Sequence, residues 1–372
     1  MKFLHIQNRI LTKPYLFSNL MNLEQFNSIK NTLVFFALTL IFVIVSQLSA
    51  ILIPFVLALL AATMFQPLIM ILKRYRVPTA VIVPIVGIIT LFFVFGIYSI
   101  VSDMYSDLLM SREYLLQRLI FRVNAVIRNI NDITGSQIAQ ATSVRELMNV
   151  IGEDFISDAA GSAANVLGSI TGSFLMFSVY YILLLAGMPH YKQYLNFVAG
   201  EQGDSDLLTT YETVQRAIFS YIIIKTLVSL FTGLFVYVIC ILFDINFALF
   251  WGFIAFALNY IPSIGSITGS IPPILMAFIQ YDSIETMIIV ALLVGMVQFI
   301  MGNLIEPKIL GDTLRINTVT VIFGLVFWGF IWGIPGMLVT VPLLVLMKLI
   351  FEQFPSLRIV ARIMGAPGKH YV

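Results

Sequence analysis

Residues 247–280 read FALFWGFIAFALNYIPSIGSITGSIPPILMAFIQ, and this stretch decides the fold of the chain. It is long enough to enter a bilayer and contains no Asp, Glu, Lys or Arg, but its middle carries the helix breakers Pro262, Gly265, Gly269, Pro272 and Pro273. Because proline removes a backbone donor and clashes with the preceding helical turn, we expect the helix to unwind near Pro262 and again near Pro272.

A second apolar run, residues 319–347, is interrupted in the same way by Gly333, Pro335 and Gly336, and one ordinary span, residues 284–304, separates the two runs. Unwound backbone at membrane depth needs partners within the protein or in a hydrated cavity, and in transporters such breaks hold substrate or coupling ions. The alternative interpretation is kinked packing helices. Both runs could cross the membrane fully, or both could be re-entrant hairpins.

Composition places the chain among polytopic membrane proteins of the all-α class. Of its 372 residues, 59% are hydrophobic and 11% are charged, and the mean hydropathy is +0.97. The formal net charge of +2 gives no reason to expect a nucleic-acid partner, so the basic residues are interpreted as topology markers. Cys240 is the single cysteine and cannot form an internal disulfide. No cleavable signal peptide is expected, because the first apolar run lacks a small-residue cleavage site.

Hydropathy and charge divide the chain into five regions. We expect a cytoplasmic tail at residues 1–31, membrane helices at 32–102, extramembrane amphipathic helices at 103–160, a membrane transport core with broken helices at 161–349 and a cytoplasmic tail at 350–372. Two helices are expected to form a tight hairpin with its turn at residues 46–49, and a third span covers 79–101. In total we predict about seven or eight membrane helices, with both termini in the cytoplasm under the positive-inside rule.

The region 103–160 carries an apolar helical stripe. The stripe has heptad spacing. One set of apolar residues recurs every seven residues, and a second set follows it at an offset of three: Leu109, Leu116, Val123 and Ile130, then Leu119, Val126 and Ile133. A second amphipathic helix is expected at about residues 143–155, where Ser143 and Glu146 match a capping box. Such a stripe could mediate self-association, lie on the membrane surface or pack against its own chain.

Lys225 lies about two turns inside an expected span at residues 217–243. A lysine at this depth either extends to the lipid headgroups or faces the protein interior with a partner. We expect the second, with Glu306 or Asp312 as the partner. The two acids could carry a proton or a sodium ion if they are buried, or they could be hydrated loop residues that mark a membrane boundary.

Polar groups near the breaks are candidate substrate contacts. Those around the first break could hold a neutral, polyhydroxylated ligand, or they could merely satisfy freed backbone groups. The predicted pathway comprises Asn259, Tyr260, Pro262, Ser263, Gly265, Ser266, Gln298, Asn303, Gly333, Pro335 and Gly336. Since the sequence contains no Ser-His-Asp, Cys-His, metal-ligand or Walker-type motif, we expect neither an enzyme nor an ATP-driven pump, and no cofactor or metal.

Several segments resemble those of the autoinducer-2 exporter-like (AI-2E) family of bacterial inner-membrane proteins. They are LNYIPSIGS at 258–266, IPPI at 271–274, GNLIEPKILG at 302–311, FWGFIWGIPGMLVTVPL at 327–343 and, with Lys225, IIIKTLVSLFTG at 222–233. The resemblance covers most of the chain. It implies export of small molecules, with the furanone-derived quorum signal as substrate for some members and sodium or lithium/proton antiport for others. It also implies a homo-oligomer, with the pentamer as one candidate.

We therefore predict a secondary transporter that exports a small polar solute across the inner membrane. A monovalent cation/proton antiporter on the same scaffold is the first alternative. An uncoupled oligomeric channel or membrane scaffold, assembled through residues 103–160, is the second. In each case the partners are the lipid bilayer, a small-molecule or ion substrate and further copies of the chain.

Overall fold

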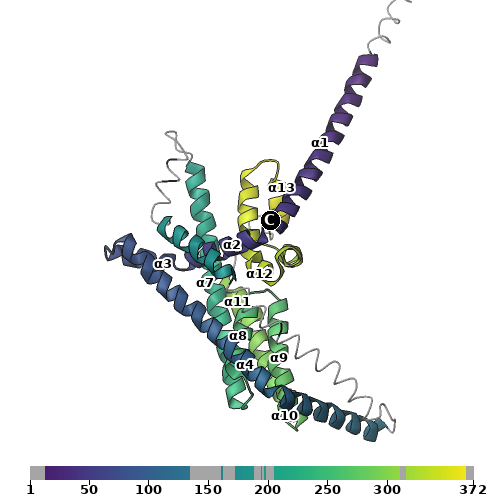
Figure 1. The fold of residues 1–372 in the computed structure, drawn as a ribbon. Helices are drawn as coiled ribbons and strands as arrows, with labels where there is room; N and C mark the ends of the chain where they lie inside the picture. The colour runs from purple at the N-terminus through teal and green to yellow at the C-terminus, as the bar shows by residue number, and fades with distance from the viewer. Residues whose placement is uncertain are drawn as a thin grey trace, which may run out of the picture. The chain divides into compact units, whose positions relative to one another are not determined.

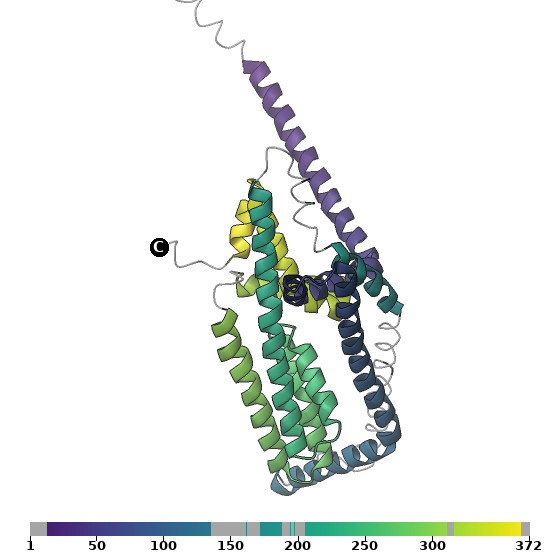
Figure 2. The same cartoon turned by 90° about the vertical axis from the view of Figure 1, so that its left-hand side faces the viewer.

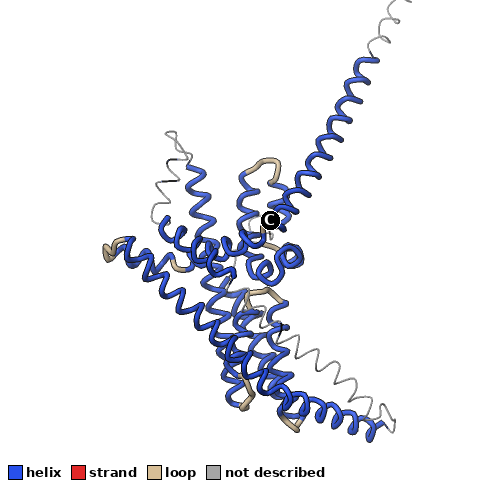
Figure 3. Tube along the Cα trace, in the orientation of Figure 1, coloured by secondary structure: helices blue, strands red, loops and turns tan. Residues whose placement is uncertain are grey.

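The computed structural model describes residues 13–134, 161, 172–187, 194, 197, 205–310 and 316–365, and every regular element among them is a helix (Figure 3). Five of these helices are long and apolar enough to cross a membrane, or six if a bent pair counts as one span. The predicted all-α, polytopic membrane class is confirmed.

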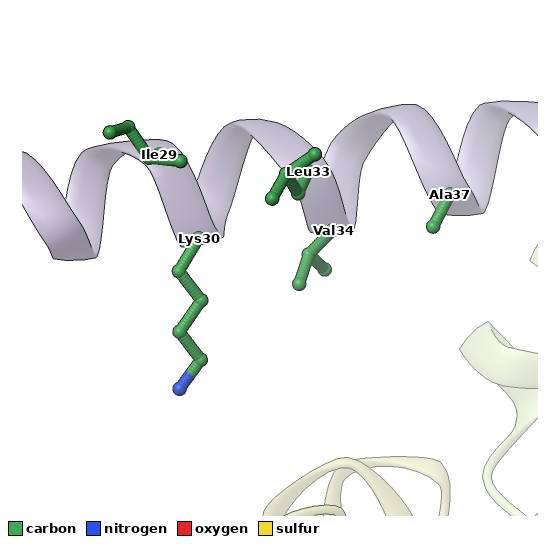
Figure 4. Close-up of a pocket in the computed structure, with 5 residues that line it drawn as sticks. All are labelled: Ile29, Lys30, Leu33, Val34 and Ala37. Carbon is green, nitrogen blue, oxygen red and sulfur yellow. The ribbon is translucent and has the colours of Figure 1, made fainter.

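The chain forms two compact units, residues 1–52 and 53–372. In the first unit, α1 (Lys13–Gln47) contains the candidate membrane span Ser28–Gln47. Figure 4 shows five of its side chains, Ile29, Lys30, Leu33, Val34 and Ala37, of which only Lys30 is polar. This part of α1 therefore presents an apolar surface suited to lipid rather than a polar binding site. The helix ends at Gln47 and α2 begins at Ser49, so two helices meet at the predicted position, while the tight hairpin stays a prediction.

α2 (Ser49–Met64), most of which belongs to the second unit, and α3 (Gln66–Arg74) form a pair bent by 43°. Ala58 and Ala62 are completely buried and pack with Ile82 and Val86 of α4 (Thr79–Thr134) and with Tyr181 of the helix Gly172–Gly187. Small side chains at this contact let the helix backbones approach closely.

The expected third span and the first amphipathic helix form one element, because α4 continues without a break from Thr79 to Thr134, and the membrane boundary near Val101 stays a prediction. Its apolar part is Thr79–Ser111, and Figure 2 shows the amphipathic remainder turning across the end of the helical bundle formed by α7–α10. Leu115 of this remainder is buried, whereas Ile130 and Ile133 of the heptad stripe, and Leu109 near the end of the apolar part, are exposed. Self-association through the stripe stays a prediction, and the second amphipathic helix, residues 143–155, lies outside the described residues.

The stretch 247–280 forms a helical hairpin, which we call the first hairpin. α8 (Ala248–Leu258) leads to a tip at residues 259–263, and α9 (Ile264–Gln280) returns alongside α8 (Figure 1). The predicted unwinding near Pro262 is confirmed. The second predicted break is wrong, because α9 passes through Pro272 and Pro273 as a helix. The two ends of the hairpin meet, since the backbone N–H of Asn246 donates to Gln280 Oε1 at 3.0 Å.

The second apolar run also folds back on itself. α12 (Thr318–Gln353) is interrupted at Gly333, which has φ of 63° and ψ of −146°, a conformation that favours glycine. A Cβ atom on Gly324 would lie 3.0 Å from Thr340 Cγ2 and 2.7 Å from Leu344 Cδ1. These residues would be far apart along a straight helix, so the two halves of α12 pack together as a second hairpin.

Both interrupted runs therefore fold back as hairpins, and the segment between them crosses the core once. α10 (Ile284–Phe299), the π-helix η3 (Ile300–Ile305) and α11 (Glu306–Leu310) form one continuous crossing. Leu310 consequently lies at the opposite end of this crossing from Asp282. The backbone N–H of Asn317 donates to the carbonyl of Met364 in α13 (Arg358–Met364) at 3.0 Å. The helix α13 therefore lies at the same end as the start of α12.

Two glycines make these returns possible. A Cβ atom on Gly265 would lie 1.7 Å from the Leu258 carbonyl oxygen, and one on Gly336 would lie 2.0 Å from the Trp328 carbonyl oxygen. We therefore expect Gly265→Ala and Gly336→Ala each to lower the free energy of unfolding by about 1–3 kcal/mol or more, since the backbone must shift.

Thermal unfolding in detergent checks this prediction, with Gly295→Ala as the control. Gly295 lies in α10 and an added Cβ would meet nothing within 4 Å, so this variant should match the wild type. Equal melting temperatures for all three variants would contradict the tight hairpin returns.

Candidate functional site

The site is built on α7 (Ser205–Leu242), a long apolar helix with a polar face. Lys225, Ser229 and Thr232 follow one another at about one helical turn, and all three are buried. Next to this face α7 approaches α8 so closely that a Cβ atom on Gly233 would lie 2.6 Å from the Gly252 carbonyl oxygen. Two glycines at the crossing thus bring the first hairpin against the polar face of α7.

Lys225 forms an ion pair across this face. Its Nζ lies 2.6 Å from Glu306 Oε1, and the two side chains are only 3% and 16% exposed. The prediction of a protein-facing lysine paired with Glu306 is confirmed. The snorkelling alternative and the reading of Glu306 as a hydrated loop residue are wrong. Asp312, the other candidate partner, lies outside the described residues.

Glu306 reaches Lys225 because the crossing helix changes its pitch just before it. The segment Ile300–Ile305 is π-helical, and Glu306 opens the following α-helical turn. An inserted π-helical turn shifts the register of the residues after it and occurs often at functional sites. Asn303, a predicted pathway residue, lies within this segment but is exposed, unlike Lys225.

The tip of the first hairpin is hydrogen-bonded to the same face of α7. The Tyr260 hydroxyl donates to Thr226 Oγ1 at 2.8 Å, and Asn259 Nδ2 donates to Ser229 Oγ at 3.0 Å. The structure thus brings together Lys225, Glu306, Asn259 and Tyr260, four of the predicted site residues. The sequence reasoning missed Thr226 and Ser229. Ser229 could have been found, because it follows Lys225 by one helical turn within an apolar run.

The other residues predicted near the tip have local roles in the structure. Ser263 is exposed with φ of 62°, and its carbonyl accepts a hydrogen bond from the Ser266 hydroxyl at 2.9 Å. This is the alternative in which polar side chains satisfy freed backbone groups. Pro262 lies at the tip, and Gly265 allows the return described above.

Two buried polar groups near the site are unsatisfied. The Tyr221 hydroxyl and both amide atoms of Gln298 have no hydrogen-bond partner among the described residues, although the two residues are 4% and 8% exposed. Tyr221 precedes Lys225 by about one turn, and Gln298 continues the buried face of Val290 and Val294 on α10. Unsatisfied buried polar groups are costly, so they mark places where a ligand or water can bind.

The second hairpin reaches the site through its arms. Val341 and Val345 pack against Tyr221 and Ile222 of α7, with Val321 beside them. The predicted pathway residues Gly333, Pro335 and Gly336 form the turn of this hairpin.

Two helical hairpins packed on a helix that carries a buried ion pair fit a membrane transporter, in which broken helices line the transport route. The sequence model of the AI-2E family of transporters matches residues 31–356. The chain therefore belongs to the AI-2E family and is an integral membrane transporter.

Individual relatives agree with this assignment. The chain is 30% identical over 325 residues to the AI-2 transport protein TqsA of Escherichia coli (strain K12), an alignment that covers 82% of this chain and 86% of that protein. It is 26% identical over 326 residues to a protein of Haemophilus influenzae, covering 85% of this chain and 90% of that protein.

The ion pair generates a stability prediction. Lys225→Met or Glu306→Gln alone should destabilise the protein by about 3–5 kcal/mol, because each leaves one buried group without its charged partner. The double variant should recover much of that loss, since no uncompensated charge remains.

Thermal unfolding of the single and double variants measures this coupling. Lys308→Met is the matched control, because Lys308 lies on α11 but is exposed. If Lys225→Met and Lys308→Met have the same melting temperature, the ion pair contributes nothing to folding.

Proposed function

We propose that this chain is a secondary transporter that exports a small polar solute, of the autoinducer-2 kind, across the bacterial inner membrane, with both termini in the cytoplasm. The observation that carries the proposal is the hydrogen bonding of the first hairpin tip to α7 beside the Lys225–Glu306 pair. The similarity to the AI-2 transport protein TqsA supports the substrate class.

The chemistry of the site suits a neutral solute that carries hydroxyl groups. Asn259, Tyr260, Thr226 and Ser229 offer amide and hydroxyl groups, while the charges of Lys225 and Glu306 compensate each other. A solute hydroxyl can both donate and accept, and it can replace a hydrogen bond broken between the tip and α7.

The proposed transport step is a movement of the hairpin tip away from α7. Breaking two hydrogen bonds between neutral side chains costs about 1–3 kcal/mol in total, which thermal fluctuation and substrate binding can supply. Two turns can absorb the movement, since Ser263 at the tip and Asp244 and Phe247 at the base have positive φ.

A monovalent cation/proton antiporter is the second candidate, and the buried Lys225–Glu306 pair favours it. If Glu306 accepts a proton, the pair is broken and Lys225 loses its counter-charge, which is the coupling step of this second candidate. Self-association through the exposed residues of the α4 stripe belongs to either proposal.

Flux in proteoliposomes separates these functions. Vesicles are loaded with autoinducer-2, and its efflux is followed with and without a proton gradient, while a pH dye records proton movement on addition of sodium or lithium. Gradient-dependent efflux supports the exporter, and cation-driven proton movement without solute efflux supports the antiporter. An ungated conductance would overturn both proposals.

Tyr260→Phe tests the role of the tip. The change removes a hydroxyl that the solute can bind once the tip has left α7, so loss of one solute hydrogen bond of about 1 kcal/mol should reduce the solute efflux rate roughly fivefold without loss of folded protein. Tyr98→Phe, a change at a partly exposed tyrosine of α4, is the control and should transport like the wild type. An unchanged rate for Tyr260→Phe would remove the hydroxyl from the proposed route.

A further inference from the structure

Arg122 is the most unusual side chain outside the site. It belongs to the amphipathic part of α4, beyond the apolar segment Thr79–Ser111, yet it is only 3% exposed. Burying an arginine is unfavourable unless its charge and its donors find partners. Neighbouring Arg128 shows the ordinary case, since it is exposed and its Nε donates to the carbonyl of Asn124 on the same helix.

The partners of Arg122 lie at the C-terminal end of α9. Its Nε donates to the Phe278 carbonyl at 3.1 Å, its Nη1 donates to the Asp282 carbonyl at 2.6 Å, and its guanidinium lies 5.4 Å from the centre of the Phe278 ring. The last carbonyls of a helix lack intrahelical donors and carry partial negative charge, so an arginine is well suited to this position.

Arg118, one helical turn earlier, binds the same end. Its Nη1 lies 3.3 Å from Asp282 Oδ1, and its Nη2 donates to the Gln280 carbonyl at 3.2 Å. Together the two arginines form what we call the α4 clamp. Asp282 is 68% exposed, so its carboxylate adds less than the bonds from Arg122 to backbone carbonyls.

The clamped end is the base of the first hairpin. The same base is bonded to the residues at the end of α7 and just after it. The Tyr281 hydroxyl donates to the Phe243 carbonyl, and the backbone N–H of Asn246 donates to Gln280 Oε1. From there α9 runs 17 residues, or about 25 Å, to the tip. Gly269 and Gly265 hold α9 closely against α8, so the hairpin moves as one body.

We propose that Arg122, assisted by Arg118, is a positioning residue for transport: through the base of the first hairpin, the amphipathic part of α4 sets where the hairpin tip lies relative to Lys225. The inference rests on the proposed function in one respect, because it takes the hairpin tip as part of the transport route. A rotation of the hairpin at its base displaces the tip most, so release of the clamp frees the tip from Thr226 and Ser229.

A cysteine reporter tests the clamp without requiring a substrate. Ile261 lies in the tip and is 4% exposed, and Ile261→Cys is placed in a Cys240→Ala background. The rate of labelling by a small water-soluble thiol reagent then measures how often the tip leaves α7. We expect Arg122→Met to raise this rate about tenfold, since charge-assisted hydrogen bonds are lost, and Arg122→Lys to raise it less. Arg128→Met is the matched control and should leave the rate unchanged.

A second reporter separates positioning from simple docking of α4. Leu115 is 6% exposed and packs in the core cluster of α7–α10, so Leu115→Cys reports release of α4 itself. If Arg122→Met raises labelling at Leu115→Cys but not at Ile261→Cys, α4 is only docked and the proposal is overturned. No change at either reporter also overturns it. If Arg122→Met does not fold, Arg122→Lys and Arg118→Met supply the same comparison.

Transport measurements complete the test. In a chain that exports solute, Arg122→Met should change the maximal efflux rate, and Arg122→Lys should restore part of it, while Arg128→Met leaves the rate unchanged. If no solute flux is found for the wild type, the proposed function fails, but the labelling comparison still decides whether the clamp positions the tip.

Discussion

The arrangement of the membrane core depends on the ion pair between Lys225 and Glu306. A lysine buried within a span requires a counter-charge. Glu306 supplies this charge from the neighbouring crossing, directly after the π-helical segment Ile300–Ile305. The pair therefore requires α7 and the α10–α11 crossing to be adjacent. Because the polar face of α7 continues from Lys225 to Ser229, the same face receives the tip of the first hairpin.

The second requirement is that backbone groups within a bilayer must be satisfied by the protein itself. The two hairpins meet it by the same means. Each is almost entirely helical, and each reverses over a short turn whose glycine lies against a carbonyl of the first arm, Gly265 against Leu258 and Gly336 against Trp328. Close packing of the arms matters here, because lipid provides no hydrophobic driving force between helices.

The first hairpin connects two places that are far apart in the core. Its tip is hydrogen-bonded to α7 beside the ion pair, and its base is held by arginines of α4. The bonds at the tip join neutral side chains, whereas those at the base involve guanidinium groups and are stronger. A body held firmly at one end and weakly at the other moves at the weak end, which is the end at the candidate site.

The sequence alone determined the membrane class, the breakers at Pro262 and Gly333, and the need of Lys225 for a partner, because hydropathy, proline and charge act locally. The tertiary structure alone decided that both broken runs fold back on themselves. Hydropathy records that a segment prefers an apolar surrounding, but whether the chain continues or returns after a break depends on contacts such as Gly265 with Leu258. The continuity of α9 through Pro272 and Pro273, which the sequence reasoning got wrong, has the same origin in packing against α8 and α10. Likewise Thr226 and Arg122 carry no signal that distinguishes them from ordinary polar residues, since their importance comes from partners distant in the chain, at Tyr260 and at the end of α9.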